Sequence, residues 1–432
     1  MNALTPVPAS SRSSPAVVVV GAGMAGLAAV RALVRIPCRI TLIDAHNYTT
    51  FPPLLFQVAT CFLSPTDVTH PVRGLLRRHR EVQFRLGRVA DVDWAGRHVL
   101  LEDGDVVGYD YLVLASGVTA AIGRIPGAAD HAIPLKSVSD ATRLRNSLLR
   151  SFEAAAGNPA VATAAATSIA VVGGGSTGVE LSGYVANFLF HQQFAADYPQ
   201  LDPGSMRVTL LEQGDRLLPG FHPTLSRYAH RLLRSRGVDV RLDTAVETIN
   251  ADGVTLDGGE RVPAATVVYA AGVEASGWVQ RLGLALSHGR LVVDADLRLS
   301  GHPDTFAVGD IAAVTSPAGV LYPQLAQVAI QTGRHAARQI ARLTTGQPTE
   351  RFSYFDKGMM AIIGRNAAVV QMRRLRLTGR LAWLAWGFLH LGYLPGTVNR
   401  VSTGLKYLWW HLTHENVHRV LLETEQDKAE VT

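Results

Sequence analysis

The chain has 432 residues, of which 47% are hydrophobic and 18% are charged, and its formal net charge is +6. This length suits two or three domains with cores of their own, which excludes a small scaffold held by disulfides. The two cysteines, Cys38 and Cys61, indicate no dithiol centre, zinc knuckle or disulfide framework, and they favour a reducing compartment. The 40 glycines, many of them clustered, indicate a globular α/β protein with phosphate-binding loops.

The N-terminal part of the chain consists of a leader and a predicted dinucleotide-binding unit. Residues 1–15 lack an apolar run of signal-peptide length, so we expect a disordered leader and no export. An apolar strand at 17–20 precedes three glycines with G-x-G-x-x-G spacing and an Ala/Leu-rich helix: Gly21, Gly23 and Gly26. Such glycines permit a tight turn, the approach of a pyrophosphate to the backbone and close helix–strand packing. A second strand at 39–44 ends on Asp44, which can accept hydrogen bonds from a ribose diol.

The same unit recurs in the middle of the chain. A buried strand precedes Gly173, Gly175 and Gly178, and the next strand ends on Glu212. That acid lies farther from its loop than is usual, and an insertion around 191–205 accounts for the excess. A carboxylate at the ribose position would repel a 2′-phosphate, which favours NADH over NADPH. Two such units in one chain imply two dinucleotides.

A third element, residues 302–314, places Gly309 and Asp310 at the end of a short apolar strand. An acid there, followed by the start of a helix, can hold a polar cofactor chain against the helix N-terminus. A strand-end cap explains the same pair equally well.

Residues 322–337 carry two stripes on one predicted helix. Small apolar side chains recur at helical spacing, and Gln324, Gln327 and Gln331 form a second stripe beside them. A solvated helix edge is the simple interpretation of these amides, so their purpose depends on the rest of the chain.

The C-terminal segment, residues 380–413, is apolar. Its first half runs for about 15 apolar residues before Pro395, which is too short to cross a bilayer core that needs roughly 20. Its second half has helical apolar spacing in Val401, Leu405, Leu408, Trp409 and Leu412, with Arg400, Lys406 and His411 toward other faces. Such helices lie in a membrane interface, although packing on the protein's own core or on a second subunit produces the same pattern.

From residue 365 to residue 419 the chain is basic, with Glu415 as its one acid. Basic residues beside an apolar helix are attracted to anionic lipid. We therefore expect peripheral attachment at the cytoplasmic face of the cell membrane. A homodimer formed through the tail is compatible with this attachment. We expect no nucleic-acid partner and no metal.

The order of these motifs, two glycine loops followed by strand-Gly-Asp, resembles the flavoproteins of the pyridine nucleotide–disulfide reductase superfamily. In that superfamily the first loop holds FAD and the second holds NAD(P)H. Five stretches narrow the resemblance to the type II NADH:quinone dehydrogenases: 47–65, 171–183, 267–276, 322–337 and 355–369. With the tail they cover the chain from about residue 16 to about residue 420 in family order. The resemblance implies FAD and NADH as cofactors and a quinone as acceptor.

The resemblance also implies an α/β fold with two Rossmann-like dinucleotide-binding domains and a C-terminal amphipathic helical membrane-anchoring region. We expect an FAD-binding domain at 16–135 and 290–365, an NADH-binding domain at 136–289, and a membrane-association region at 366–432. The stretches 109–117 and 266–273 look like the strands that close the two nucleotide-binding domains, and Gly272 in the second is assigned to cofactor binding.

In that family the positions that match Ala326, Gln327 and Gln331 lie on the flavin side of a quinone channel. A quinone is a flat apolar ring with two carbonyls, so small walls admit it and neutral amides orient it. The resemblance places Glu180 where nicotinamide and quinone meet the flavin, and Lys357 beside the flavin ring. A partly desolvated carboxylate or ammonium there could relay protons. On its residues alone, Glu180 is equally a first-turn helix acid favoured by the helix dipole.

The expected reaction is hydride transfer from NADH to FAD, then two-electron reduction of a membrane quinone without ion pumping. Cys61 alone cannot cycle as a disulfide, which disfavours a disulfide reductase and a sulfide-oxidising quinone reductase. The sequence departs from the family pattern in three places: Cys61 replaces a usual glycine, residues 49–53 replace a more polar run, and Met359 and Ile362 replace smaller or hydroxylated residues. The alternatives are a reductase of the same fold with a protein or small-molecule acceptor, and a non-enzymatic flavoprotein sensor at a membrane.

Overall fold

The structure, a computed structural model, describes residues 14–158, 165–189, 192–202, 206–413 and 418–422. Most of the predicted leader therefore lies outside the described residues. The chain divides into two compact units, each assembled from three stretches of sequence. The first unit comprises residues 1–48, 71–118 and 275–354, and the second comprises residues 49–70, 119–274 and 355–432.

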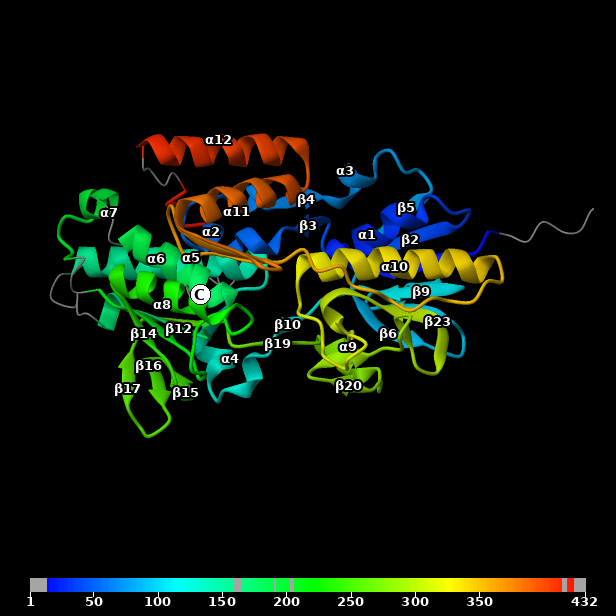
Figure 1. Cartoon of the computed structure of the whole chain (residues 1–432), viewed down its shortest axis with the longest axis horizontal. Coiled ribbons are helices and arrows are strands. Elements are labelled where there is room, and N and C mark those ends of the chain that lie inside the picture. The colour runs from blue at the N-terminus through cyan, green and yellow to red at the C-terminus, as the bar shows by residue number, and fades with distance from the viewer. Residues whose placement is uncertain (1–13, 159–164, 190–191, 203–205, 414–417, 423–432) are drawn as a thin grey trace, which may run out of the picture. The chain divides into compact units, whose positions relative to one another are not determined.

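The first unit is built on a six-stranded sheet in the order β22-β23-β9-β1-β2-β5 (Figure 1). Its strands are β22 (Arg298–Leu299), β23 (His302–Ala307), β9 (Tyr111–Leu114), β1 (Ala16–Val20), β2 (Arg39–Asp44) and β5 (Val82–Leu86). All neighbours are parallel except β22 and β23. The valine run of β1 is buried because parallel strands carry apolar side chains on both faces. The strands predicted at 17–20 and 39–44 are confirmed, and the stretch 109–117 contains β9.

Helices α1 (Met24–Leu33) and α10 (Ala326–Thr344) pack against each other in the first unit. A side chain at Gly333 of α10 would lie 2.1 Å from the backbone oxygen of Ala25 in α1, so this close approach requires glycine. Ala336 and Ala337 of α10 are fully buried in the same core. Gly333, Ala336 and Ala337 therefore pack in this core, so this part of the small-residue face does not line a ligand as expected. The helix also begins at Ala326, later than the predicted stretch.

Two three-stranded sheets complete the first unit: β6 (Val89–Asp93), β7 (His98–Leu101) and β8 (Val106–Gly108), and β20 (Leu286–Ser287), β21 (Arg290–Val292) and β24 (Ala312–Ala313). Two short helices, α3 (Val72–Leu76) and α9 (Gly277–Arg281), accompany them. After β23 the chain forms only the single 3₁₀ turn η6 (Gly309–Ile311) before it enters β24. The helix start expected directly after Asp310 is therefore limited to this turn.

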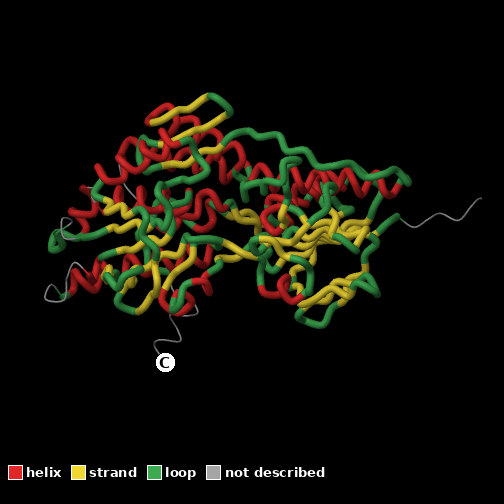
Figure 2. The backbone as a smooth tube through the Cα atoms, turned by 60° about the horizontal axis from the view of Figure 1, so that its bottom comes forward, coloured by secondary structure: helices red, strands yellow, loops and turns green. Residues whose placement is uncertain are grey.

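The second unit is built on a parallel sheet in the order β11-β18-β12-β13-β14. Its strands are β11 (Ala132–Pro134), β18 (Thr266–Tyr269), β12 (Ile169–Val172), β13 (Val208–Leu211) and β14 (Val238–Arg241). Its main helices are α5 (Val138–Gly157), α6 (Ser176–Leu189) and α8 (Pro223–Ser235). Helix α5 begins at a capping box, in which Ser137 and Asp140 each accept the other's backbone N–H. Figure 2 shows the sheets of both units in yellow and their helices in red.

Smaller elements extend the second unit. These are β10 (Thr119–Ala120), β19 (Val273–Glu274), β15 (Val246–Asn250), β16 (Gly253–Leu256), β17 (Arg261–Pro263), α2 (Leu55–Ala59), α4 (Ala128–His131) and α7 (Gln192–Asp197). The antiparallel strands β25 (Met359–Ile362), β26 (Ala368–Met372) and β27 (Leu375–Thr378) follow near the C-terminus, and β25 packs on α6.

The chain then forms two successive helices, α11 (Gly379–Tyr393) and α12 (Thr397–Thr413), which contact each other (Figure 1). Helix α11 coincides with the predicted apolar stretch before Pro395. In the part of the chain that the structure describes, no helix has the length and apolarity needed to cross a membrane.

Candidate functional site

The first glycine loop joins β1 to α1. Gly21 has a φ of +107°, and a side chain there would lie 2.3 Å from the backbone oxygen of Ala115. A side chain at Gly26 would lie 1.8 Å from the backbone oxygen of Gly21. By contrast, a side chain at Gly23 would meet no described atom within 4 Å. The outer glycines are thus required by the fold, whereas the middle one leaves the backbone accessible at a helix N-terminus, which suits a phosphate.

The second glycine loop, between β12 and α6, repeats this arrangement. Gly173 has a φ of +114°, and its added side chain would lie 2.5 Å from the backbone oxygen of Ala270. At Gly178 the added side chain would lie 1.9 Å from the backbone oxygen of Gly173. Gly175 again has no described neighbour within 4 Å of such a side chain. Both loops therefore fit the pyrophosphate of a dinucleotide.

The two predicted ribose acids are held in the same way. Asp44 accepts a hydrogen bond from the backbone N–H of Ala22 at 2.6 Å, and Glu212 accepts one from Gly174, also at 2.6 Å. The second oxygen of each carboxylate accepts the backbone N–H of the residue two positions later, at 2.7 Å in both cases. These bonds fix each acid against its glycine loop and leave lone pairs that can accept ribose hydroxyls.

Gly309 lies against the first loop. Its φ is +75°, and an added side chain would lie 2.8 Å from the Cβ atom of Ala25. Its backbone N–H donates to the hydroxyl of Thr332 at 3.0 Å, and the carbonyl of Asp310 accepts from the amide of Gln324 at 3.0 Å. The first unit thus brings the first glycine loop, the Gly-Asp pair and the start of α10 together.

Ala326, Gln327 and Gln331 occupy the first two turns of α10 and are partly exposed. They lie on the helix whose Thr332 binds the backbone of Gly309. All of the predicted residues of the first unit therefore belong to one connected region of that unit.

Glu180 is buried on α6. Its carboxylate accepts the backbone N–H of Ile362 at 3.2 Å. Burial raises the pKa of this carboxyl to about 8, against the opposing effect of that hydrogen bond. The first turn of α6 contains no acid, so the interpretation of Glu180 as a first-turn residue favoured by the helix dipole is wrong. A buried carboxyl with this pKa is suited to donate and accept protons near neutral pH.

Three further residues of the second unit that the sequence singled out are Lys357, Gly272 and Cys61. Lys357 is exposed, so the expectation of a partly desolvated ammonium is not met, and its ammonium donates to the hydroxyl of Tyr393 at 3.3 Å. Gly272 has a φ of +137°, which favours glycine. Cys61 is a packed side chain, as predicted, and burial raises its thiol pKa to about 12. Its φ of +61° explains why glycine is usual at this position in the family that the sequence resembles.

Sequence reasoning did not single out a polar chain that joins three helices of the second unit. The hydroxyl of Tyr407 in α12 donates to the side-chain oxygen of Gln57 in α2 at 2.7 Å. The side-chain nitrogen of Gln57 donates to the hydroxyl of Tyr184 in α6 at 3.2 Å. Gln57 is fully buried, and the one available signal was an amide inside the apolar run LLFQVA.

Helix α12 is also fixed by a partly buried ion pair. The ammonium of Lys406 lies 2.7 and 2.6 Å from the two carboxylate oxygens of Asp67. The amide of Asn399 donates to three backbone carbonyls, those of Thr66, Asp67 and Thr69. One face of α12 therefore packs on the rest of the second unit. For this face, packing on the protein's own core, one of the two interpretations of the sequence, is correct.

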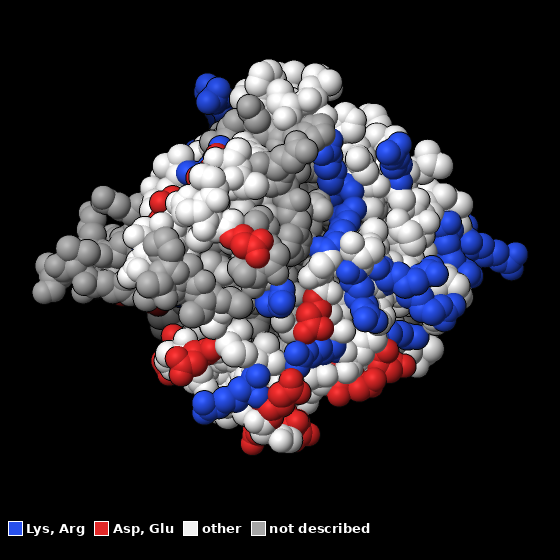
Figure 3. All heavy atoms as spheres, turned by 90° about the vertical axis from the view of Figure 1, so that its left-hand side faces the viewer, with Lys and Arg blue, Asp and Glu red and all other residues white. Residues whose placement is uncertain are grey.

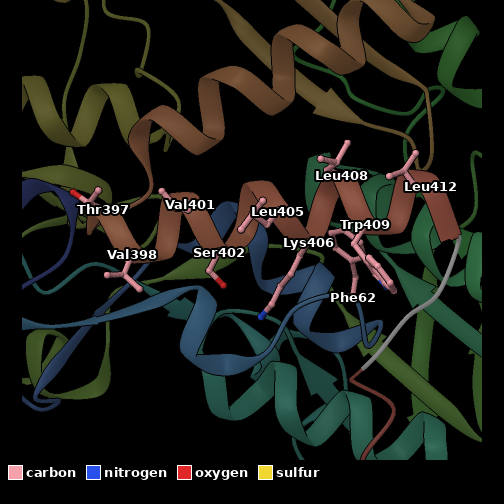
Figure 4. Close-up of a pocket in the computed structure, with 10 residues that line it drawn as sticks. All are labelled: Phe62, Thr397, Val398, Val401, Ser402, Leu405, Lys406, Leu408, Trp409 and Leu412. Carbon is pink, nitrogen blue, oxygen red and sulfur yellow. The ribbon is translucent and has the colours of Figure 1, made fainter.

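An apolar groove runs along α12 beside this contact. A cavity of about 760 Å³ lies along it, lined by Phe62, Thr397, Val398, Val401, Ser402, Leu405, Lys406, Leu408, Trp409 and Leu412 (Figure 4). Leu405 and Leu412 are 61% and 69% exposed, which is unusual for large apolar side chains. In Figure 3, Lys and Arg gather on the right of the face shown, whereas Asp and Glu lie mainly along its lower edge.

Residues 15–333 match the family described as pyridine nucleotide-disulphide oxidoreductase. Type II NADH:quinone oxidoreductase NdhA of Mycobacterium tuberculosis is 37% identical, with 89% of this chain and 85% of that protein covered. Type II NADH:quinone oxidoreductase Ndh of the same organism is 35% identical, with 96% and 91% covered. The solved structure of NDH2 from Plasmodium falciparum in complex with NADH has a TM-score of 0.85 at 19% identity, covers 95% of this chain and 100% of its own, and shows the shared fold. The chain therefore belongs to the type II NADH:quinone oxidoreductases, within the pyridine nucleotide-disulphide oxidoreductase family.

Proposed function

We propose that the protein is a non-pumping NADH:quinone oxidoreductase that takes a hydride from NADH and reduces a membrane quinone by two electrons. FAD, when bound, supplies the redox chemistry that connects the two substrates. The observation that carries this proposal is the duplicated glycine loop, in which each middle glycine is accessible and each ribose acid is fixed to its loop. Two dinucleotide sites in one chain are what this reaction requires.

We assign FAD to the first loop and NADH to the second. Residues that would hold FAD are Gly21, Gly23, Gly26, Asp44, Gly309, Asp310 and Ala326, in a domain of residues 16–135 and 290–365. Residues that would hold NADH are Gly173, Gly175, Gly178, Glu212 and Gly272, in a domain of residues 136–289. The negative charge of Glu212 selects NADH because it repels the 2′-phosphate of NADPH.

The acceptor half of the reaction is assigned to four residues. Gln327 and Gln331 orient the quinone carbonyls with amides, which stay neutral at every pH. Glu180 delivers a proton, because a buried carboxyl with a pKa of about 8 is largely protonated at neutral pH. Lys357, whose ammonium is held by Tyr393, supplies a positive charge that stabilises developing negative charge.

The double variant Gln327→Leu/Gln331→Leu tests the assignment. Rapid mixing would follow the bleaching of the flavin by NADH and its re-oxidation by quinone as separate phases. We expect quinone re-oxidation to slow by about a hundredfold, because two orienting donors are lost, while bleaching by NADH is unchanged. Gln347→Leu, the same change at an exposed position of the first unit, is the matched control. A loss of both phases together, or of neither, contradicts the assignment.

We also propose that residues 366–432 attach the protein to the cytoplasmic face of an anionic membrane. The support is the exposed apolar face of α12 together with basic residues of this segment outside the ion pairs of Lys406 with Asp67 and of Arg419 with Asp197: Arg373, Arg374, Arg376, Arg380 and Arg400. A lipid-soluble acceptor makes such attachment useful, because the quinone then need not cross water. A homodimer formed through the same segment is compatible with it.

Vesicle sedimentation tests the attachment. Leu405→Glu/Leu412→Glu should abolish binding to vesicles that contain anionic lipid, because it places two charges on the apolar face. Val320→Glu changes an equally exposed apolar residue of the first unit and serves as the control. Equal binding of both variants contradicts the proposal. If the protein binds only neutral vesicles, the attraction of its basic residues to anionic lipid is contradicted.

A further inference from the structure

The polar chain of Tyr407, Gln57 and Tyr184 has a fixed direction. Gln57 accepts the hydroxyl hydrogen of Tyr407 on its side-chain oxygen, and its side-chain nitrogen, which can only donate, donates to the hydroxyl oxygen of Tyr184. Tyr184 therefore acts as an acceptor here and keeps its own hydroxyl hydrogen for another partner. The three side chains thus form one continuous hydrogen-bonded chain from α12 through α2 to α6.

The chain ends next to Glu180. Glu180 and Tyr184 are four residues apart on α6, so their side chains lie on the same face of the helix, one turn apart. Burial raises the pKa of the hydroxyl of Tyr184, and the negative charge of Glu180 raises it further. Burial likewise raises the pKa of Tyr407, and Glu180 adds to that effect as well. The carboxylate on α6 and the hydroxyl on α12 therefore share one poorly solvated environment.

Aromatic rings keep water out of this environment. The ring of Tyr184 packs against Phe56 at 4.8 Å and is nearly parallel to the ring of Trp410 on α12 at 6.5 Å. The ring of Phe62 contacts Tyr407 at 5.1 Å and Trp410 at 5.0 Å. Helix α12 thus supplies two of the five rings, and its detachment would admit water.

The other charged groups near Glu180 are few. Elements β12, β13, β25 and α2 place no titratable side chain against it, and α2 contributes the neutral amide of Gln57. Helix α8, which also packs on α6, carries Arg227, Tyr228, His230, Arg231 and Arg234, and at its end Arg236 donates to the carbonyls of Ile363 and Arg365. On β14, Asp239 and Arg241 bind each other at 2.9 Å on the surface. The chain of Tyr407, Gln57 and Tyr184 is the link that the described residues provide between α12 and the helix that carries Glu180.

We propose that Tyr407, Gln57 and Tyr184 are positioning residues for quinone reduction, which couple the seating of α12 to the environment of Glu180. Through this chain, the solvation of Glu180, the proposed proton donor, depends on the seating of α12, the helix that carries the exposed apolar face. The inference rests on the proposed function for its catalytic meaning, whereas the physical coupling of α12 to Glu180 can be measured without turnover.

The first experiment measures that coupling by thermal unfolding of the full chain between pH 5 and pH 9. A double-mutant cycle combines Tyr407→Phe with Glu180→Gln, and a second cycle combines Gln57→Met with Glu180→Gln. Glu180→Gln should raise the melting temperature more at high pH than at low pH. In the Tyr407→Phe and Gln57→Met backgrounds this pH-dependent gain should shrink by about half, because a better solvated Glu180 costs less when charged.

The second experiment measures kcat/KM for quinone against pH. In Tyr407→Phe and in Gln57→Met, the high-pH limb of the profile should shift to lower pH by about 0.5 pH unit or more. The bleaching of the flavin by NADH should be unchanged. The matched control is Tyr198→Phe, which removes a buried hydroxyl of the second unit that is bound to Glu153 at 2.8 Å. This control should keep the wild-type profile and the wild-type coupling.

Three results are decisive. Wild-type coupling and a wild-type profile in both test variants overturn the proposal. An equal shift in Tyr198→Phe also overturns it, since the effect would then be general loosening of the unit. If the wild-type protein reduces no quinone, the proposed function fails, and the unfolding cycles still decide whether α12 and Glu180 are coupled.

Discussion

The carboxylate of Glu180 in α6 accepts a hydrogen bond from the backbone N–H of Ile362 in β25. This bond joins a helix of the parallel sheet to the antiparallel strands near the C-terminus of the same unit. Because the donor is a backbone group, the isoleucine side chain, which departs from the family pattern, leaves the contact intact. The acid is therefore held in a site that desolvates it and offers this one compensating donor among the described groups.

The first prediction concerns stability and pH. The folded-state pKa of Glu180, about 8, is above its ordinary value of 4.5, so folding favours the protonated form. The stability of the wild type should consequently fall relative to Glu180→Gln as pH rises from about 4.5 to about 8, by a total of the order of a few kcal/mol. Chemical unfolding at fixed pH values measures this difference.

Glu247→Gln is the control for this prediction, because it removes the charge of an exposed glutamate in the same unit. Its stability should follow that of the wild type across the whole pH range. A constant difference between Glu180→Gln and the wild type would show that Glu180 has an ordinary pKa in the folded protein, and its assignment as proton donor would lose its physical basis.

The second prediction separates the glycines of the second loop. Gly178→Ala forces a methyl group to within 1.9 Å of the backbone oxygen of Gly173 and should destabilise the protein by about 3 kcal/mol. Gly175→Ala meets no described atom and should fold normally, yet it should raise the KM for NADH about tenfold, because the methyl group blocks the approach of the pyrophosphate. Melting temperatures and steady-state kinetics of the two variants distinguish these effects.

A comparison of Gly23→Ala with Gly26→Ala extends this test to the first loop, where the same spatial contrast exists. The readout there is the amount of FAD retained after purification. If Gly23→Ala and Gly175→Ala both behave as the wild type, the accessible backbone in these loops is not where phosphates bind.

The glycine loops and their acids could be predicted from sequence because the chemistry is local. Each loop connects one strand to the next helix, and Asp44 ends the adjacent strand, so spacing alone identifies the unit. The contacts of α12 could not be predicted in this way. Tyr407 and Gln57 are 350 positions apart, and no periodicity connects positions so distant.

Helix α10 shows a different limit of sequence reasoning. Its stripe of small residues has the same spacing whether it faces a ligand or a neighbouring helix. The sequence therefore suggested a wall for a quinone, whereas Gly333 is small because α1 passes 2.1 Å from where its side chain would be. Only the arrangement of the two helices decides between these interpretations.

The third prediction concerns the attachment of α12. Lys406→Met leaves the carboxylate of Asp67, which is 7% exposed, without its cation, and should destabilise the protein by about 2 to 4 kcal/mol. The double variant Asp67→Asn/Lys406→Met should recover part of this loss, since no unpaired charge remains. Limited proteolysis between α11 and α12 should be faster in the single variant than in the double variant. Wild-type stability of Lys406→Met would show that the pair contributes nothing to the seating of α12.

The fourth prediction concerns cofactor choice. Glu212→Gln keeps the size of the side chain and removes the charge that would repel a 2′-phosphate. The ratio of kcat/KM for NADH to that for NADPH should fall at least about tenfold, mostly because NADPH becomes a better substrate. Two backbone N–H groups, those of Gly174 and Gly214, bind the wild-type carboxylate, and an amide can accept only one of them, so some loss with NADH is also expected.

Glu260→Gln is the control for this change, because Glu260 is an exposed acid of the same unit whose partner is Arg241. It removes one negative charge from the unit without touching the second loop, so the preference for NADH should remain. If Glu212→Gln and Glu260→Gln change the ratio equally, the preference comes from the overall charge of the unit. An unchanged ratio in Glu212→Gln would mean that the 2′-phosphate of NADPH is excluded by something other than the acid at the end of β13.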